Sequence, residues 1–224
     1  MNDIINNFPI YYDAVILAAG DFPQHSLPIK ILRQAKKLFV CDGALANLLK
    51  LNITPTAIIG DGDSINNTLK QRFSDIYHQI EEQEENDLTK ATRYALAHIN
   101  KEHVGKQLPR FCYIGATGKR EDHTIGNISL MMYYYKELGI IPTMVTDYGY
   151  FHTSNGEHTF SSLPKQQVSV FNCSCTYLKS EGLKWDIYPM KQFWQGTLNE
   201  ALTNSFTING NGFYLVYQTF AQKE

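Results

Sequence analysis

The sequence predicts an α/β protein in which a Rossmann-like parallel-sheet domain is followed by an all-β sandwich domain. In the first part of the chain, short apolar runs alternate with stretches of helical periodicity. This alternation is typical of a parallel sheet with helices on both faces. The last part contains strand patterns separated by turn signals and no long helix, which favours an antiparallel unit, either a sandwich or a partial barrel. We therefore expect two domains in the 224 residues, 1–147 and 148–224.

Five buried strands are predicted in the first domain. Each is a short apolar run rich in β-branched or aromatic residues, as in strands that are covered on both faces. The runs occupy residues 14–18, 38–41, 57–59, 111–114 and 143–146. Helices are predicted between them over residues 26–35, 43–51, 66–73, 87–101 and 124–138. Gly139 and Pro142 are typical residues after the end of a helix.

The second domain is predicted to consist of strands only. The predicted strands occupy residues 168–171, 175–178, 205–208 and 213–217. Three glycine-containing segments between apolar runs are interpreted as turns, because asparagine and glycine favour the backbone conformations that tight turns need. These turns are predicted at Asn155-Gly156, Glu181-Gly182 and Asn209-Gly210-Asn211-Gly212.

Composition excludes several classes of protein. The chain has 20 basic and 22 acidic residues, a formal net charge of -2. Proteins that bind nucleic acid by broad phosphate neutralisation carry a basic excess, so we expect no nucleic-acid partner. No apolar run reaches the roughly 18 residues of a membrane span, and the first residues do not form a secretory signal. We expect a cytoplasmic protein without a membrane partner, with its four cysteines as free thiols.

Glycine and charged residues follow several of the predicted strands. Parallel sheets bind ligands outside the carboxyl ends of their strands, so these junctions are candidate site segments. Any one of them could be a plain turn or a helix cap. Taken together, they predict a common site at one edge of the sheet. The segments are Ala19–Pro23, Asp42–Ala44, Gly60–Ser64, Gln83–Lys90 and Gly115–His123.

Asp61-Gly62-Asp63 is the sharpest of these segments, with the hydroxyl of Ser64 next to it. Two carboxylates 4 Å apart repel each other by about 4 kcal/mol at an effective dielectric near 20, so they need wide spacing or a cation. Oxygen ligands on a loop suit Mg²⁺, whose coordination is completed by waters and substrate phosphates. Asp87 and Lys90 share one face of a predicted helix. They could form a structural ion pair, or a metal ligand beside a phosphate contact.

The segment from Gly115 to His123 has features of an anion site. Its glycines would let backbone N–H groups approach a phosphate at a helix N-terminus, and Arg120 could hold the phosphate with two hydrogen bonds. The G-K-[S/T] ending of a Walker A loop is absent. His123 could act as a base or as a hydrogen-bonding support.

In combination, these motifs resemble the thiamin pyrophosphokinase (thiamine diphosphokinase) family over nearly the whole chain. The resemblance rests on Asp42-Gly43-Ala44, Gly60-Asp61-Gly62-Asp63-Ser64, Gln83…Asp87-x-x-Lys90, Gly115-x-x-Gly118-x-Arg120-x-Asp122-His123…Asn127, Gly182-Leu183-Lys184-Trp185 and Gly196-Thr197-Leu198-Asn199-Glu200. There are two departures. Leu198 stands where the family often has serine, and Asp42 is followed by one glycine where two are common.

The resemblance implies an enzyme that transfers the pyrophosphoryl group of ATP to the hydroxyl of thiamine and leaves AMP. It implies Mg²⁺ as cofactor and a homodimer, with ATP bound by the first domain and thiamine binding and dimerisation supported by the second. The implied metal ligands are Asp61, Asp63 and Asp87, which with Asp122 are also the implied catalytic residues. The implied phosphate site comprises Asp42, Gly43, Ser64, Lys90, Gly115, Gly118, Arg120, Asp122 and His123.

Thiamine contacts are implied for three residues, Gln83, Trp185 and Asn199, with Trp185 supplied by the partner subunit. A carboxylate would accept the proton of the thiamine hydroxyl, and Asp61, Asp87 and Asp122 all remain candidates.

Two other functions are compatible with parts of the sequence. Ile16-Leu17-Ala18-Ala19-Gly20 resembles the start of the sugar-nucleotide nucleotidyltransferase signature, but Asp21-Phe22-Pro23 replaces the glycine-rich arginine segment that follows it there. A non-catalytic nucleotide-binding module is the second alternative. The number of converging charged motifs favours catalysis over binding alone.

Overall fold

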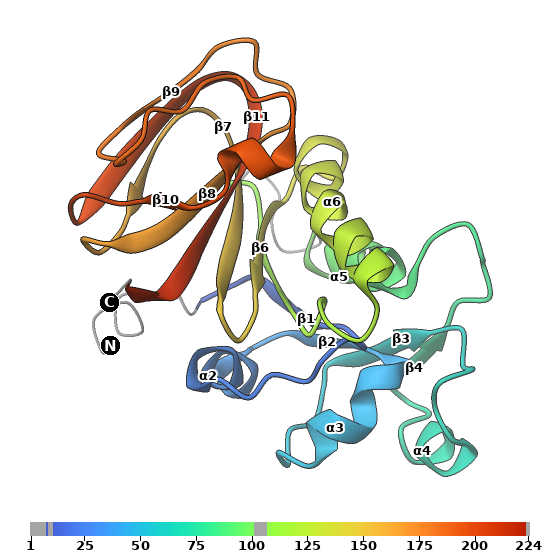
Figure 1. Cartoon of the computed structure of the whole chain (residues 1–224). Helices are drawn as coiled ribbons and strands as arrows, with labels where there is room; N and C mark the ends of the chain where they lie inside the picture. Colours follow the sequence, from blue (N-terminus) through green and yellow to red (C-terminus); the bar gives the residue numbers. More distant parts are fainter. Residues whose placement is uncertain (1–7, 9–10, 101–106, 223–224) are drawn as a thin grey trace. The chain divides into compact units, whose positions relative to one another are not determined.

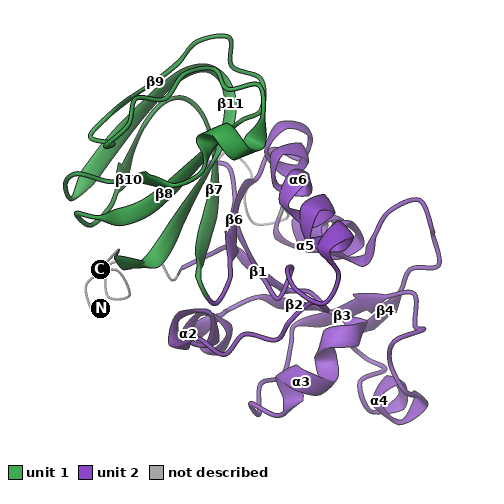
Figure 2. Cartoon of the chain, viewed as in Figure 1, with its two compact units in different colours: residues 1–8, 148–224 green, residues 9–147 purple. Residues whose placement is uncertain are grey.

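The computed structural model describes residues 8, 11–100 and 107–222 (Figure 1). The chain divides into two compact units, residues 9–147 and residues 148–224 together with residues 1–8 (Figure 2). The division after Asp147 coincides with a change from parallel to antiparallel strand pairing. None of the described helices combines the length and apolar character that crossing a bilayer would require.

The described part of residues 9–147 contains a parallel sheet in the order β6-β5-β1-β2-β3-β4. Its strands are β1 (Ala14–Leu17), β2 (Leu38–Cys41), β3 (Ala57–Gly60), β4 (Tyr77–Gln79), β5 (Arg110–Ile114) and β6 (Ile141–Val145). Every residue of β1, β2 and β3 is buried, as expected for strands covered on both faces. The five predicted strands are confirmed. The edge strand β4 was not predicted, because Tyr77-His78-Gln79 has no apolar run.

Helices connect these strands. They are α2 (Ser26–Gln34), the 3₁₀ turn η1 (Asp42–Ala44), α3 (Leu45–Leu49), α4 (Asn67–Arg72), α5 (Asp87–Asn100) and α6 (Glu121–Glu137). All five predicted helices are present, and α6 begins three residues earlier than predicted. Helix α5 packs against β1, β2 and β3. It buries Leu88, Ala91, Ala95 and Ile99 at helical spacing, so its first residue is held near the carboxyl ends of those strands.

Two buried tyrosines join α5 to the rest of this unit. The rings of Tyr113 and Tyr134 stack with centroids 5.5 Å apart. Their hydroxyls hydrogen-bond with Thr92 (3.1 Å) and Thr89 (2.8 Å) on α5. The rings therefore fill the core while no buried hydroxyl of this group lacks a partner, which is the condition for burying a polar group at low cost.

The unit that contains residues 148–224 is built from antiparallel strands. They are β7 (Gly149–Ser161), β8 (Gln166–Asn172), β9 (Leu178–Glu181), β10 (Asn199–Glu200) and β11 (Ser205–Gln222), with the 3₁₀ turn η2 (Phe193–Gly196) before β10. β11 pairs with β7 along nearly its whole length, and its opposite edge pairs first with β9 and then with β8. β8 pairs with β10, and a bridge between Leu183 and Ala201 joins the ends of β9 and β10. This ring of pairings encloses an apolar core that includes Val170, Phe206 and Val216.

Two predicted turns were wrong. Asn155-Gly156 lies inside β7, and Asn209-Gly210-Asn211-Gly212 lies inside β11. The two segments face each other, and the β7–β11 register shifts between Asn209 and Phe213. Gly156 has a φ of +68°. Here the glycines allow a bulge that bends two long strands, whereas the prediction used them to reverse the chain.

Strand bounds in this unit differ from the prediction for a related reason. The predicted strands 205–208 and 213–217 are parts of β11, and the predicted strand 175–178 begins only at Leu178. Residues 173–177 form no strand, and Cys175 is buried in this loop while Cys173 is exposed. All four cysteines are free thiols, as predicted.

We predict that Tyr134→Ala lowers the free energy of unfolding by about 3–5 kcal/mol, because it removes a fully buried ring from a packed core. Tyr133→Ala is the matched control. Tyr133 is the preceding residue of α6, is exposed, and contacts Arg93 through its hydroxyl. We expect the control to lose less than about 1 kcal/mol in urea unfolding. Equal losses in the two variants would contradict the packing role of Tyr134.

Candidate active site

The parallel sheet has a topological switch point between β1 and β5. The chain runs from β1 outward through β2, β3 and β4, and β5 then pairs with the other edge of β1. The loops that follow β1 and β5 are bound to each other by backbone hydrogen bonds, Gly20 N–H to Gly115 C=O (2.7 Å) and Asp21 N–H to Thr117 C=O (2.8 Å). Ligands of open α/β sheets bind at this kind of position.

Glycines allow these two loops to approach closely. A Cβ at Gly20 would collide with the carbonyl oxygens of Gly115 and Thr117, and a Cβ at Gly118 would collide with the carboxylate of Asp21. Gly115 and Gly118 also have positive φ values of +65° and +81°. The N–H of Gly118 donates to the hydroxyl of Thr124 (3.0 Å). The predicted glycines of this segment thus support loop-to-loop packing, and this N–H is already engaged.

Four aspartates gather at the carboxyl ends of β2 and β3, and we call Asp42, Asp61, Asp63 and Asp87 the acidic group. Asp42 follows β2 and is only 2% exposed. Its Oδ2 accepts a hydrogen bond from the N–H of Gly62 (3.1 Å), between the other two loop aspartates. Asp61 Oδ1 accepts the N–H of Asp63 (3.0 Å), which closes the loop on itself. Asp87 is the first residue of α5.

Within the acidic group, the charges of the aspartates change the pKa values of their neighbours. Burial raises the pKa of Asp42, and the charge of Asp61 adds to this increase, against hydrogen bonds from Gly62 and Gly43 that lower it. Burial also raises the pKa of Asp87, and so do the charges of Asp42, Asp61 and Asp63, while Lys90 lowers it. Charges affect one another in this way only when they are close, which is consistent with the predicted convergence of these segments. Among the described residues, no three histidine, cysteine, aspartate or glutamate side chains lie close enough to hold a metal ion by themselves.

Lys90 is the buried cation beside this group, at 4% exposure. Its Nζ lies 3.9 Å from Asp87 Oδ1 and donates to the carbonyl oxygen of Ile80 (3.4 Å). The two residues predicted to share a helix face therefore form an ion pair in this structure. Because Lys90 is buried, this pair is screened less than a surface pair would be.

Two residues near the acidic group were missed in the sequence. A Cβ at Gly62, whose φ is +95°, would lie 2.5 Å from Lys70 Nζ and 2.8 Å from the hydroxyl of Tyr77. The charge of Lys70 lowers the pKa of Asp42. Burial raises the pKa of Tyr77, and the charges of all four aspartates raise it further. Lys70 lies on a short helix and Tyr77 on a polar edge strand, so neither had a motif that could have identified it.

The remaining predicted residues of these loops lie on the outside of the site. Ser64 is exposed and lies against Gly43, where an added Cβ would be 3.3 Å from that of Ser64. Gln83 is exposed, and its Nε2 donates to the carbonyl oxygen of Glu81 (3.2 Å). Gln79, which was not predicted, supports the acidic loop by donating from Nε2 to the carbonyl oxygen of Asp61 (2.9 Å).

At the start of α6, the predicted phosphate residues bind each other. Arg120 donates to both oxygens of Asp122 at 3.1 and 2.6 Å, and both side chains are exposed. This hydrogen-bonded guanidinium lowers the pKa of Asp122. The backbone N–H of His123 donates to Asp122 Oδ1 (2.9 Å). Among the described residues, no hydrogen bond or ion pair joins these three side chains to the acidic group.

A pair of asparagines links the two halves of the site instead. Asn127 of α6 donates from Nδ2 to the carbonyl oxygen of Ala116 (2.8 Å), and its Oδ1 accepts from Asn86 Nδ2 (3.3 Å). Asn86 in turn accepts the N–H and the hydroxyl of Thr89 at the start of α5. The loop after β5 and the beginning of α5 are therefore held together by side-chain amides.

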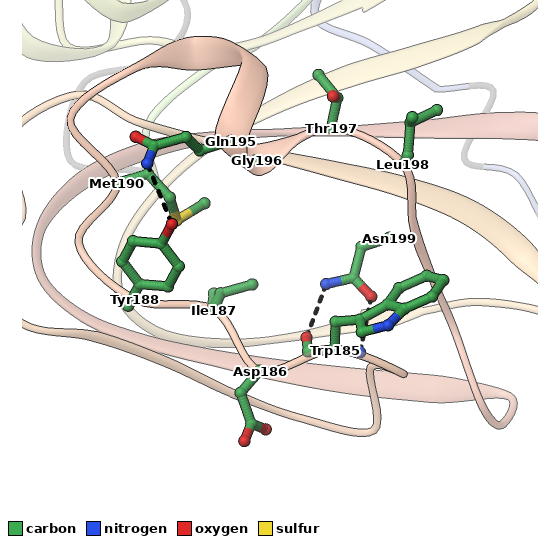
Figure 3. A pocket seen from close by; sticks show the side chains of 10 residues that line it. All are labelled: Trp185, Asp186, Ile187, Tyr188, Met190, Gln195, Gly196, Thr197, Leu198 and Asn199. Atoms are coloured by element: carbon green, nitrogen blue, oxygen red, sulfur yellow. Dashed lines mark hydrogen bonds between the residues drawn. The ribbon is translucent and has the colours of Figure 1, made fainter.

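A separate pocket of about 320 Å³ lies in the antiparallel unit, lined by residues 185–188, 190 and 195–199 (Figure 3). The predicted Trp185 and Asn199 are among its lining residues, and the side chain of Asp186 points away from it (Figure 3). Asn199 holds the backbone of Trp185 from both sides: Oδ1 accepts its N–H (3.2 Å), and Nδ2 donates to its carbonyl oxygen (2.8 Å). The amide of Asn199 is thus engaged in positioning Trp185, whose side chain is half exposed.

Leu198, the departure noted in the sequence, lies on the rim of this pocket. It has a φ of +66° and is 74% exposed. Left-handed backbone is uncommon for a residue with a Cβ, so the conformation is imposed by its surroundings. The next residue, Asn199, is itself fixed by three hydrogen bonds with Trp185 and Glu200.

Comparisons with known proteins cover both units. A family model described as "Thiamin pyrophosphokinase, catalytic domain" matches residues 29–141, and one described as "Thiamin pyrophosphokinase, substrate-binding domain" matches residues 149–217. A search of curated proteins found no match. Among solved structures, thiamine pyrophosphokinase from Bacillus subtilis superimposes with a TM-score of 0.72 at 20% identity, covering 93% of this chain and 99% of that one.

The enzymes of two fungi are also similar in structure. Thiamin pyrophosphokinase from Candida albicans has a TM-score of 0.77 at 16% identity and covers 95% of this chain and 90% of its own. The yeast enzyme has a TM-score of 0.76 at 14% identity, with 98% and 90% covered. At these identities the structural matches establish the fold, and the family models, which match both units in order, establish the family. The chain belongs to the thiamin pyrophosphokinase family and is a thiamine diphosphokinase.

Proposed function

We propose that this thiamine diphosphokinase takes the diphosphoryl group from ATP, bound with Mg²⁺ at the acidic group, and transfers it to the hydroxyl of thiamine, with release of AMP. The observation that carries the proposal is the gathering of four aspartates beside the buried Lys90, at the carboxyl edge of the parallel sheet. Such a group is expensive to maintain in a fold without a bound cation, because its members raise the pKa values of one another.

The donor set is suited to Mg²⁺. This ion is usually held by one or two carboxylates, with waters and substrate phosphates completing its shell, so it does not require three protein ligands in one cluster. Asp61, Asp63 and Asp87 are the proposed ligands, of which one or two would bind the ion directly. When bound, the ion would neutralise charge on the phosphate oxygens during transfer.

The chain's own residues would mainly position the phosphates of the donor and neutralise their charge. Asp42 holds the loop between Asp61 and Asp63 through the N–H of Gly62, and Lys90 supplies a buried positive charge. Arg120 would exchange Asp122 for a phosphate, because a guanidinium binds carboxylate and phosphate with the same two-pronged geometry. Ser64, Gly43, Gly115, Gly118 and His123 complete the proposed phosphate site. This division of work fits phosphoryl transfer, where positioning and electrostatics supply most of the rate.

The proton of the thiamine hydroxyl would pass to a carboxylate. Three candidates followed from the sequence, Asp61, Asp87 and Asp122. Arg120 lowers the pKa of Asp122, which makes this carboxylate the weaker base while the pair persists. Release of Arg120 to a phosphate would remove this effect, so Asp61, Asp87 and Asp122 all stay candidates.

We further propose that thiamine binds at the pocket of Trp185. The indole face would stack on the cationic thiazolium. Asn199 would act by fixing Trp185 in place. Gln83 would lie near the transferring group.

The proposed working form is a cytoplasmic homodimer in which Trp185 is supplied to the site of the other protomer.

The reaction itself is tested by incubating the protein with thiamine, ATP and Mg²⁺ and separating the nucleotides. We expect AMP and thiamine diphosphate in equal amounts, and no turnover when the metal is removed with a chelator. ADP as the only nucleotide product would indicate transfer of a single phosphoryl group. Release of pyrophosphate with a sugar phosphate as acceptor would favour a nucleotidyltransferase, and nucleotide binding without turnover would favour a non-catalytic module.

For the acidic group, we predict that Asp63→Asn lowers kcat by at least about a hundredfold, because the exposed carboxylate serves the metal and not the fold. Thermal unfolding should be nearly unchanged, since Asp63 is exposed. Asp75→Asn is the matched control: Asp75 is also exposed and lies before β4, so its activity should equal that of the wild type. A large loss of stability in Asp63→Asn, with normal activity per folded molecule, would show a structural carboxylate instead.

The role of Trp185 is tested by subunit complementation. Asp63→Asn and Trp185→Ala subunits are co-expressed with different tags, and the mixed dimer is purified through both. In this dimer one site combines an intact Asp63 with the intact Trp185 of the other subunit, so we expect about half of the wild-type activity from two inactive parents. If Trp185 serves its own subunit, the mixed dimer stays inactive. A monomeric solution mass with full activity would refute the dimer.

A further inference from the structure

Lys70 and Tyr77 meet at a point beside the acidic group that the proposed mechanism does not use. Lys70 comes from the last turn of α4 and Tyr77 from β4, and both polar ends lie over Gly62, within 3 Å of where a Cβ would stand. The ammonium of Lys70 also lies 5.8 Å from the centre of the Tyr77 ring. Gly62, which lies between Asp61 and Asp63 in the chain, therefore leaves room for both polar ends beside its backbone.

The hydroxyl of Tyr77 has no hydrogen-bond partner among the described residues, and it is closed off from solvent. Buried hydroxyls without a partner are rare in folded proteins, because the lost hydration is not replaced. Tyr113 and Tyr134 in the same unit both have partners for their hydroxyls. The unpartnered hydroxyl of Tyr77 lies beside the acidic group, whose charges raise its pKa.

The charges around Gly62 are unbalanced. Of the two ammonium groups that act on the acidic group, Lys90 is already bound to Asp87 and to the carbonyl oxygen of Ile80. Lys70 acts on Asp42, but no ion pair within 4 Å links it to a carboxylate in the part of the chain described. Its ammonium retains donors that could bind a second anion.

We propose that Lys70 and Tyr77 bind the transferred phosphates of the donor, Lys70 through its charge and Tyr77 through its O–H. Two donors that point to one spot suit phosphate oxygens, whereas the cationic thiazolium would be repelled by Lys70. This inference rests on the proposed function, and adds two residues to its phosphate site. Lys70 and Tyr77 would orient the diphosphoryl group over Gly62 between the metal-binding aspartates.

Binding without turnover tests this role. Titration calorimetry with α,β-methylene-ATP and Mg²⁺ measures affinity for a nucleotide in which the bond to be cleaved is blocked. We expect Lys70→Gln and Tyr77→Phe each to weaken this affinity about tenfold, as for the loss of a hydrogen bond to a charged group. Affinity for AMP, which lacks the transferred phosphates, should be unchanged. Lys70→Arg should retain most of the binding.

Matched controls remove the same chemical groups elsewhere in the unit. Lys50→Gln changes an exposed lysine that contacts Asn47, and Tyr11→Phe removes an exposed hydroxyl. Both should bind the analogue like the wild type, and all variants should retain the wild-type melting temperature. Unchanged analogue binding in Lys70→Gln and Tyr77→Phe would overturn the inference, and so would an equal loss of AMP affinity.

The proposed function can fail separately. If the wild-type protein binds the analogue in a manner that depends on Lys70 but does not turn over thiamine, the two residues keep their role and the proposed reaction is wrong. If it forms thiamine diphosphate while both variants bind the analogue normally, the reaction stands and this role is wrong. Absence of any analogue binding by the wild type would also overturn the role.

Discussion

Repulsion among four aspartates at one edge of the parallel sheet is the constraint on which the rest of the active unit depends. Asp42 is buried, and Asp87 has its pKa raised by burial and by its neighbours. Only a rigid scaffold can hold such charges together, and the fully buried strands β1, β2 and β3 provide it. Gly60 is part of the same arrangement, since a Cβ there would collide with the carboxylate of Asp42.

The parallel sheet was predictable because its strands are buried on both faces. A run such as Ala14–Leu17 has few alternatives once it is too short for a helix and too apolar for a loop. The edge strand β4 lacks that signal, and its place is determined by pairing with β3. In the antiparallel unit, local sequence signals led to wrong turn predictions. Asn-Gly fits a hairpin turn and a bulge equally well, and only the partner strand decides between them.

The candidate active site likewise has features that the sequence predicts and features that depend on tertiary packing. The closeness of its acidic residues could be predicted, because the loops after parallel strands lie at the same edge of the sheet. What surrounds them could not. Lys70 and Tyr77 reach Gly62 through the packing of α4 and β4, and the Asn86–Asn127 link exists only once α5 and α6 are in position. Asn199 was predicted as a thiamine contact near Trp185, and its hydrogen bonds with the backbone of Trp185 could not be predicted because they depend on tertiary contact.

An acidic group that binds a polyphosphate needs an explanation, since like charges repel. In the proposed reaction the aspartates and the nucleotide can be neighbours only if a cation is shared between them. Free ATP would meet four carboxylates, whereas the metal-bound nucleotide brings the charge that offsets them. The same reasoning explains why the cations of the site are few and fixed. A larger basic surface would bind any nucleotide, while Lys90 is buried and Arg120 is paired with Asp122, which a phosphate would replace in the proposed reaction. In the proposed reaction, acidity at the site would therefore select the metal-bound donor, and a net charge of -2 is compatible with a phosphate-transferring enzyme.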